Sequence, residues 1–453
     1  MVYIPNTDAD RRKMLDRIGV TSFDELLTPI PENLRLKETI SLPEPLSELE
    51  LLRQIEHLSR KNRSDLVIFA GGGVYDHFIP AVVSQIIGRP EFATAYTPYQ
   101  AEVAQGTLQV IYEYQTHICR LTGMDVANAS MYDGASAAAE AARLSMAKTG
   151  RNKIVISETV SPLYREVTAT YLSGQETELM VIPRRGGKTD FDRVVDAVDD
   201  SVSCIILAQP NFFGLLEDID LAAELIHRVG GHLVLAVDPI AAAVLRTPAD
   251  YGADIVVGEG QPLGLPLNFG GPLLGIFAVK KELIRLLPGR LAGRTVDLEG
   301  NTGFVLTLQT REQHIRRDRA TSNICTSQAL CATAATVYLS LMGRQGLKKV
   351  ALLSMDKTYR SVRKICKIDG FEPYFKGDFV REVAVKTPVS AKALIEKMVA
   401  EKAILPGVNL GRFYADMDDG LLVAATEKRT EDEIDAMIKA LQEYTSDAVL
   451  SKV

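Results

Sequence analysis

The run LVLAVD at residues 233–238 is a short apolar segment that ends on a carboxylate, and segments of this kind decide the fold class. Segments of this kind, rich in Val, Ile and Leu and bounded by Gly, Pro or Asp, are typical of strands buried on both faces. Similar runs occur at Lys153–Ser157, Leu179–Pro183, Ser203–Ala208, Ile255–Gly258 and Leu273–Val279. Helical stretches lie between most of them, and this alternation predicts an α/β domain around a mainly parallel sheet.

The pattern changes twice along the 453 residues, which predicts three parts. Residues 1–64 should form a helical and extended arm, with a helix at Asp8–Ile18 and a capping box at Ser47–Glu50. Residues 65–325 carry the α/β pattern. Residues 326–453 should form a small α+β domain, in which two long helices are followed by three strands and two more helices. A chain of this length is too long for one small core.

Composition and charge exclude several classes of function. The net charge is −7 with basic and acidic residues interspersed, whereas a nucleic-acid-binding protein concentrates its basic residues in a patch. The chain begins without an apolar signal core and has no apolar run of the ~20 residues that span a bilayer, so we expect a cytoplasmic protein without a membrane segment. The five cysteines form no C-x-x-C pair, so neither a disulfide framework nor a metal site is expected.

Two features suit a pyridoxal-phosphate enzyme of the aspartate-aminotransferase type. The alanine-rich helix predicted at Gly134–Lys148 opens with DGAS at residues 133–136, and free amides at a helix start can cradle a phosphate. Asp238 stands where this fold places the aspartate that pairs with the pyridine nitrogen. Both features also have an ordinary interpretation, because Asp and Ser are common helix caps and Asp-Pro is common turn chemistry.

A third feature, the lysine that binds the cofactor, is missing. The segment after the Ile255–Gly258 run reads EGQPLGLPLNFGGP at residues 259–272, and no lysine occurs between Thr189 and Val279. A Schiff base needs a primary amine within reach of the aldehyde, and none of the predicted strands supplies one.

Several longer segments resemble the glycine decarboxylase P-protein. They are FAGGGVYDHF at 69–78, TAYTPYQAE at 94–102, QGTLQ at 105–109, EYQT at 113–116, the helix start at 133–140, the loop at 267–275 and QTREQHIRRDRATSNICT at 309–326. Together they run over most of residues 60–340 and resemble subunit 1 of P-proteins that are split into two chains. The resemblance implies an aspartate-aminotransferase-like fold (pyridoxal-phosphate-dependent transferase fold type I), with a mainly parallel seven-stranded sheet in its large domain.

In the sister subunit of that family, a lysine precedes a proline and a glycine run that ends in Gly-Gly-Pro. Aligned on Pro266 and Gly270–Pro272, this motif puts Gln261 where the lysine would be. The resemblance therefore implies an α2β2 heterotetramer in which subunit 2 holds pyridoxal phosphate covalently. It further implies glycine dehydrogenase (aminomethyl-transferring) activity in the glycine cleavage system, which decarboxylates glycine and passes the aminomethyl group to the lipoylated H-protein.

Candidate binding residues fall into three groups, and no catalytic residue is assigned in this chain. In dimers of this fold a loop before the C-terminal domain often reaches the neighbour's phosphate, and the residues at that place are Thr321, Ser322 and Asn323. Polar groups suited to orienting a small amino acid are Tyr96, Thr97, Tyr99 and Gln100. A vestigial cofactor cup would comprise Gly134, Ser136 and Asp238.

Each of these assignments has an alternative that must be considered. Asn323 and Thr326 could cap a helix that starts at Ser327, and the tyrosines could pack at an interface. At the level of function, the chain could be a self-sufficient pyridoxal-phosphate-dependent decarboxylase or aminotransferase, against which the missing lysine counts. It could also be a non-catalytic scaffold for the sister subunit.

Overall fold

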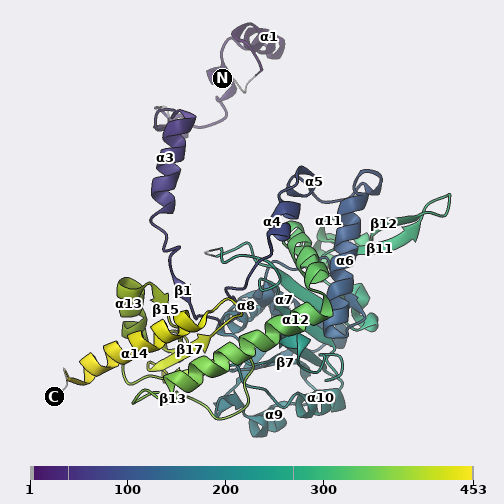
Figure 1. Cartoon of the computed structure of the whole chain (residues 1–453). Coiled ribbons are helices and arrows are strands. Elements are labelled where there is room, and N and C mark those ends of the chain that lie inside the picture. Colours follow the sequence, from purple (N-terminus) through teal and green to yellow (C-terminus); the bar gives the residue numbers. More distant parts are fainter. Residues whose placement is uncertain (1–4, 39, 269, 451–453) are drawn as a thin grey trace. The chain divides into compact units, whose positions relative to one another are not determined.

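The computed structural model describes residues 5–38, 40–268 and 270–450 (Figure 1). The chain divides into two units, one up to Ser64 and one from Asp65. The first unit holds α1 (Asp8–Ile18), α2 (Phe23–Leu26), the 3-10 turn η1 (Glu32–Leu34) and α3 (Glu48–Ser59). The further division at residues 325 and 326 stays a prediction.

Helices α1 and α3 of the first unit both begin with a capping box. Thr7 and Asp10 cap α1, and Ser47 and Glu50 cap α3 as the sequence predicts, so that each pair satisfies two free amides. Neither helix contains a buried residue. Many large apolar side chains of this unit are exposed, among them Leu34, Leu36, Ile40, Leu42, Leu52 and Ile55. Apolar surface of this extent is typical of a segment that is covered by another part of its own chain or by a partner.

A seven-stranded sheet forms the centre of the second unit, in the order β2-β10-β9-β8-β7-β3-β4. Its strands are β2 (Val126–Ala127), β3 (Lys153–Ser157), β4 (Glu178–Ile182), β7 (Val202–Gln209), β8 (His232–Val237), β9 (Ile255–Glu259) and β10 (Gly275–Val279). Neighbours from β4 to β9 are parallel, whereas β10 is antiparallel to both of its neighbours. The expected mainly parallel seven-stranded sheet is confirmed, and with it the α/β fold class.

Helices cover both faces of this sheet. Because side chains alternate along a strand, β7 sends Ile205 and Leu207 into one core and Cys204 and Ile206 into the other. The first core is closed by α6 (Gln105–Thr122), α9 (Phe191–Ala197), α10 (Ile219–Arg228) and the first half of α12 (Ala329–Ile365). The second is closed by α7 (Gly134–Thr149) and α8 (Pro162–Leu172).

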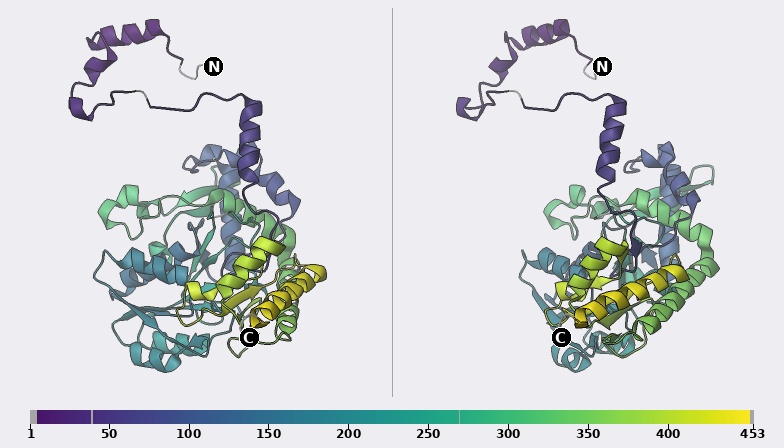
Figure 2. Two further views of the ribbon diagram at one scale, coloured as in Figure 1. Left: turned by 90° about the vertical axis from the view of Figure 1, so that its left-hand side faces the viewer. Right: turned by 60° about the vertical axis from the view of Figure 1, so that its left-hand side comes forward.

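A smaller antiparallel sheet follows, in the order β13-β14-β17-β16. Its strands are β13 (Glu372–Pro373), β14 (Glu382–Lys386), β16 (Val408–Asn409) and β17 (Gly420–Ala424). The helices α13 (Ala391–Lys402), α14 (Glu431–Leu450) and the second half of α12 pack on it. Figure 2 shows α14, in yellow, beside the green α12.

Helix α12 unites the two long helices predicted at Ser327–Leu341 and Gly346–Lys364. It starts slightly later than predicted, at Ala329, and breaks at Gly343, where φ is 56° and ψ is −174°. Glycine adopts this backbone conformation without steric cost. The break therefore falls in the gap between the two predicted helices.

Short elements connect these parts. The short helices and 3-10 turns are α4 (Ala81–Ile87), α5 (Pro90–Ala93), η2 (Ala101–Val103), η3 (Ala241–Ala243), η4 (Lys281–Leu286), η5 (Gln309–Arg311), α11 (Gln313–Arg316), η6 (Arg317–Arg319) and η7 (Leu410–Arg412). The paired strands are β1 (Val67–Ile68) with β15 (Ile404–Leu405), β5 (Arg184–Arg185) with β6 (Lys188–Thr189), and β11 (Leu291–Val296) with β12 (Thr302–Thr307). Within the described residues, every helix is too short or too polar to cross a membrane.

Candidate functional site

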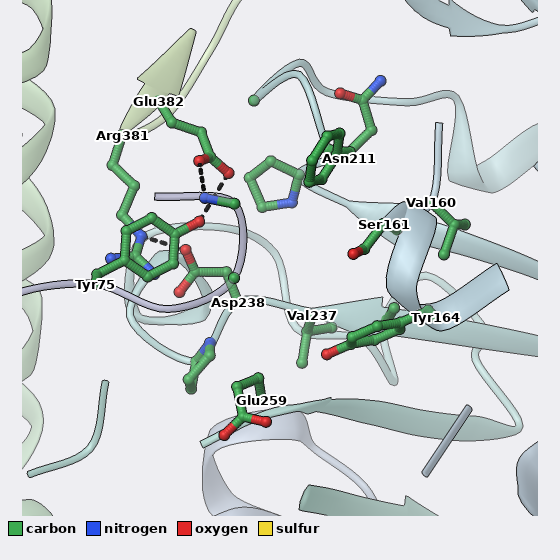
Figure 3. A pocket seen from close by; sticks show the side chains of 18 of the residues that line it. Tyr75, Val160, Ser161, Tyr164, Asn211, Val237, Asp238, Glu259, Arg381 and Glu382 are labelled. Carbon is green, nitrogen blue, oxygen red and sulfur yellow. Dashed lines mark hydrogen bonds and ion pairs between the residues drawn. The ribbon is translucent and has the colours of Figure 1, made fainter. Parts of the chain in front are cut away.

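A cavity opens where the parallel strands β7, β8 and β9 end (Figure 3). Open parallel sheets bind ligands outside the carboxyl ends of their strands, so a site is expected at this edge. The loop after β1, the start of α8 and the start of β14 complete the wall. Lining side chains that carry a charge or a hydroxyl group are Tyr75, Ser161, Tyr164, Asp238, Glu259, Arg381 and Glu382.

Asp238 forms an ion pair with Arg381, whose side chain is 3% exposed (Figure 3). Its other oxygen, Oδ1, accepts the backbone N–H groups of Ile240 at 2.9 Å and Ala241 at 3.2 Å. The Arg381 guanidinium also lies 3.5 Å from the centre of the Tyr75 ring, as a cation–π contact. Both oxygens of Asp238 are therefore engaged within the chain.

His77 continues this network towards Glu427. The Nη1 atom of Arg381 lies 2.6 Å from His77 Nε2, and His77 Nδ1 lies 2.7 Å from a carboxylate oxygen of Glu427. A guanidinium can only donate, so Nε2 accepts and the neutral ring carries its proton on Nδ1. Nδ1 then donates to Glu427, and the ring is fixed in one tautomer.

Glu259, the last residue of β9, binds the start of α7. Its Oε2 atom accepts the N–H of Gly134 at 3.1 Å, and its Oε1 atom accepts the N–H groups of Gln261 at 2.9 Å and Leu274 at 3.0 Å. Burial raises the pKa of this carboxyl group to about 7. The predicted helix start is confirmed, with Asp133 and Ser136 as a capping box.

Gln261 is 1% exposed and all of its amide is used. Its Oε1 atom accepts the N–H of Tyr75 at 2.9 Å, while Nε2 donates to the carbonyl oxygens of Tyr75 at 3.1 Å and Leu265 at 2.8 Å. The position predicted for the missing lysine is thus a structural anchor that ties the loop after β1 to the loop after β9.

Glu382 joins the same loop to the small sheet. It accepts the N–H of Gly72 at 2.9 Å and the hydroxyl of Tyr75 at 2.7 Å, and burial raises its pKa to about 7. Gly71 has no room for a side chain, because a Cβ there would lie 2.5 Å from the Tyr75 ring and 2.6 Å from the Glu382 carboxylate. The glycine triplet therefore allows a close approach between this loop and β14.

Thr321 and Ser322 line a second cleft, which is rich in cationic side chains. The charged residues of its wall are Arg285, Arg311, Arg316, Arg319 and Glu312. Asn323 is exposed beside it. Helix α12 begins at Ala329 after Gln328, without a side-chain cap bond, so the alternative in which Asn323 and Thr326 cap that helix is wrong.

The residues Tyr96, Thr97, Tyr99 and Gln100 line one depression on the surface. The Tyr99 hydroxyl lies 3.1 Å from Arg290 Nη2, from which it accepts, and 3.3 Å from Glu312, to which it donates. Since Glu312 belongs to the wall of the arginine-rich cleft, Tyr99 joins the two predicted clusters. Neither cluster shares a lining residue with the cavity at the sheet edge.

Comparison with known proteins identifies the family. The family model described as glycine cleavage system P-protein matches residues 1–441. A probable glycine dehydrogenase (decarboxylating) subunit 1 from Carboxydothermus hydrogenoformans is 49% identical over 443 residues, which cover 97% of this chain and 99% of that protein. The chain belongs to the glycine cleavage system P-protein family.

Two further P-protein relatives agree. A protein of the same name from Moorella thermoacetica is 47% identical, over 98% of this chain and 99% of that protein. The crystal structure of a glycine decarboxylase (P-protein) of the glycine cleavage system, in inhibitor-bound form, matches with a TM-score of 0.90 and 41% identity over 98% of this chain and 100% of that chain. The expected pyridoxal-phosphate fold type I is thereby confirmed.

Pyridoxal phosphate, which the P-protein fold implies, does not fit the residues of this cavity. No lysine lines the described wall, and the amide of Gln261 is fully bonded to backbone. The amide at the start of α7 is taken by Glu259, and Asp238 is taken by Arg381. Of the three residues of the predicted cup, Asp238 lines the cavity, Gly134 meets Glu259 and Ser136 caps α7.

Sequence reasoning placed Asp238 and Gly134 at the P-protein cavity but missed their partners. Arg381 lies 143 positions after Asp238, and no local pattern could join them. Glu259 lies in the segment that the sequence singled out for its missing lysine. The sequence did hold a signal for the role of Glu259. It is a carboxylate at the end of a buried strand, and a helix start with free N–H groups is predicted nearby.

Proposed function

We propose that this chain is the first subunit of a two-subunit glycine decarboxylase, the glycine dehydrogenase (aminomethyl-transferring) of the glycine cleavage system. The supporting observation is a full-length relation to proteins named subunit 1 of that enzyme, together with an amine position that holds Gln261. A chain with this fold and no amine for the cofactor needs a sister that supplies one. Pyridoxal phosphate on the sister's lysine supplies an electron sink for the loss of the glycine carboxylate.

The proposed partner is subunit 2, in an α2β2 heterotetramer of the cytoplasm, with lipoylated H-protein as the acceptor of the aminomethyl group. The name of the relatives, subunit 1, supports a second subunit. The sequence also suggests the alanine-rich helix at 134–148 as a contact surface, but most of that helix, α7, is buried within this chain. The candidate contact surfaces that remain are the first unit and residues 94–116. Both carry exposed apolar side chains, including Leu52, Ile55, Tyr96 and Val103. Obligate interfaces are apolar and bury ~2,000 Å² or more.

We assign Thr321, Ser322 and Asn323 to the phosphate of the cofactor on the sister subunit. Support comes from the four arginines in the wall that Thr321 and Ser322 share. Guanidinium groups bind phosphate through paired, charge-assisted N–H bonds, and hydroxyl groups complete such sites as neutral donors. The role of this chain at the phosphate is to orient the cofactor from across the interface.

We assign Tyr96, Thr97, Tyr99 and Gln100 to the binding of glycine. They line one depression, and Tyr99 is held by Arg290 and Glu312. A small amino acid offers an ammonium and a carboxylate, for which hydroxyl and amide groups are suitable partners.

Reconstitution tests the proposal. The exchange of the glycine carboxyl group with labelled bicarbonate, in the presence of lipoylated H-protein, is measured for this chain, for the sister and for both together. We expect exchange from the two subunits together and from neither alone. Full exchange by the sister alone would make this chain dispensable. Exchange by this chain alone, with a borohydride-reducible adduct on one of its lysines, would make it a self-sufficient enzyme.

A variant separates a catalytic contribution from scaffolding. Tyr99→Phe removes one hydroxyl without changing the shape of the depression. We expect a higher KM for glycine in the complex while size-exclusion chromatography shows the same assembly. An unchanged KM and kcat would favour the scaffold, since the assembly would then be all that this chain provides at that position.

A further inference from the structure

We infer that Glu259 is a built-in replacement for a bound phosphate, and that the cavity of this chain is thereby closed to pyridoxal phosphate and to inorganic phosphate. The inference rests on the contacts within this chain and stands whether or not the proposed function holds.

Backbone N–H groups surround the carboxylate of Glu259 as hydrogen-bond donors. Helix α7 is 16 residues long and points its start at the cavity edge of the sheet, where free amides attract an anion. Glu259 takes the Gly134 amide there, together with the amides of Gln261 and Leu274. Three backbone donors thus converge on one carboxylate that is 7% exposed. This is the arrangement that a phosphate would otherwise require from the chain.

The space beside the start of α7 is already filled by other parts of the chain. A Cβ on Gly134 would lie 1.8 Å from the Tyr164 hydroxyl oxygen and 2.9 Å from the backbone nitrogen of Glu259. Tyr164 and β9 therefore occupy the volume next to the first turn of α7. A phosphate therefore cannot approach Gly134 from the side of Tyr164, and the Gly134 N–H is already bonded to Glu259.

The charged side chains of the cavity wall also disfavour an anion. The charged side chains that line the cavity are Asp238, Glu259, Glu382 and Arg381, so three carboxylates face one guanidinium. Arg381 is already paired with Asp238. Above about pH 7, where Glu259 and Glu382 are ionised, a phosphate with close to two negative charges would meet repulsion that no free cation in the described wall offsets. The place for the pyridine nitrogen of the cofactor is also closed, because both oxygens of Asp238 already have partners.

A tethered carboxylate has a consequence for the folded chain. It satisfies the helix start at all times, whereas a cofactor would do so only when bound. The cavity of this chain is then complete without any ligand. Each pair of unlike subunits would hold one cofactor, and this chain would not compete for it.

Titration of the full-length chain with inorganic phosphate, followed by phosphorus NMR or calorimetry, tests the inference. The parent and every variant carry Arg316→Ala and Arg319→Ala, so that the arginine-rich cleft does not contribute, and the parent in this background should show no saturable binding. Glu259→Ala should bind phosphate at least about tenfold more tightly than any residual binding of the parent. The matched control is Glu217→Ala. Glu217 is also buried, and its carboxylate accepts hydrogen bonds from Thr159, Thr189 and Asn211, none of which belongs to α7. It should gain no phosphate binding.

Two outcomes of the titration overturn the inference: parent chain that binds phosphate as tightly as Glu259→Ala, or a folded Glu259→Ala that binds none. If Glu259→Ala does not fold, hydrogen exchange of the parent decides. The amides of Gly134, Gln261 and Leu274 should exchange slowly and at the same rate with and without phosphate. Fast exchange, or slowing by phosphate, would show that the three donors are open and the inference is wrong.

Discussion

Gln261 holds the loop after β1 by both backbone groups of Tyr75, and this limits what a lysine could do at that position. Lysine has donors but no acceptor, so the Tyr75 N–H would lose its partner in a buried place. A lysine at this position would therefore leave the loop after β1 without one of its anchors. Restoring one amine does not restore a cofactor site.

Gln261→Lys should fail to give a borohydride-reducible adduct with pyridoxal phosphate. It should also lower the free energy of unfolding by about 1–3 kcal/mol, because a buried amide is left without an acceptor. Denaturant unfolding and mass spectrometry after reduction measure the two effects. Gln261→Met is the control that removes the hydrogen bonds without adding a charge. An adduct at position 261 would contradict the prediction.

Glu382 gives the stability of the chain a pH dependence with a definite sign. Burial raises its pKa from the ordinary 4.5 to about 7 in the folded chain, so the folded state keeps a proton that the unfolded state has released. The contribution of Glu382 to stability is then highest below 4.5 and falls as pH rises towards about 7, by an amount on the order of 3 kcal/mol. Above this range the contribution is constant. Glu259 acts with the same sign.

Glu382→Gln should flatten the fall in stability across this pH range, because the amide cannot ionise. The free energy of unfolding, measured at several pH values on both sides of the range, provides the comparison. Glu224→Gln, an exposed change in a surface pair with Arg228, should keep the slope of the parent. A Glu382→Gln chain whose stability has the same slope as the parent between pH 4.5 and about 7 would refute the assigned contribution.

At the residue scale, sequence reasoning found the positions but not the contacts. Asp238 was identifiable because a strand end is a local feature, and Gln261 because a conspicuous residue type is absent there. Arg381 and Tyr75 are brought to Asp238 and Gln261 by tertiary folding alone. Their partnership depends on side-chain geometry that periodicity does not contain.

Helix α7 is the element that positions the cavity, and its alanines let it lie close to the sheet. Ala137, Ala138, Ala141 and Ala142 are fully buried in the core between them. Close packing of this kind has no space for extra methylene groups, whereas the outer side of the helix does. The two sides of α7 therefore differ in their tolerance of larger residues.

Ala138→Leu should lower the free energy of unfolding by about 1–3 kcal/mol through overpacking. Ala147→Leu, an exposed change on the same helix, should leave it nearly unchanged and serves as the matched control. Chemical denaturation of both variants measures the difference. Equal stability of the two variants would mean that the contact between α7 and the sheet is loose.

The elements themselves followed from local signals more closely than the site did. The capping box at Ser47 gives a helix start that the structure confirms. The antiparallel direction of β10 did not follow, because an apolar run reads the same in both directions. The hairpin β11–β12 also went unassigned, although Asp297–Gly300 is ordinary turn chemistry between its strands.

At the scale of the whole molecule, the arginine-rich cleft and the first unit are the surfaces that we propose for contact with the sister subunit. Asn323→Ala in the complex should weaken the retention of cofactor by about 1.5–3 kcal/mol, because a bond to a charged group is lost. Dialysis against a cofactor-free buffer, followed by absorbance, measures retention. Cys325→Ala, at another exposed position of the same loop, is the control. Equal retention in an intact complex would exclude the phosphate role of Asn323.

The exposed apolar face of α3 should matter to assembly rather than to folding. Leu52→Asp together with Ile55→Asp should leave the unfolding midpoint of the chain alone unchanged, because both side chains are exposed. The same pair should weaken association with the sister subunit by at least about tenfold. Arg53→Asp, an exposed polar position on the same helix, controls for the added charge. Unchanged co-elution of the double variant would remove α3 from the interface.

The exposed leucines and isoleucines of the first unit also bear on how a cell must make this protein. A copy of the chain without its partner exposes apolar surface, which holdase chaperones bind and which makes a chain a target for proteases. We therefore expect the amount of this chain to follow the supply of its sister, with any surplus cleared. Balanced translation of the two messages would then set the level of active enzyme, so that a shortfall of either subunit limits both.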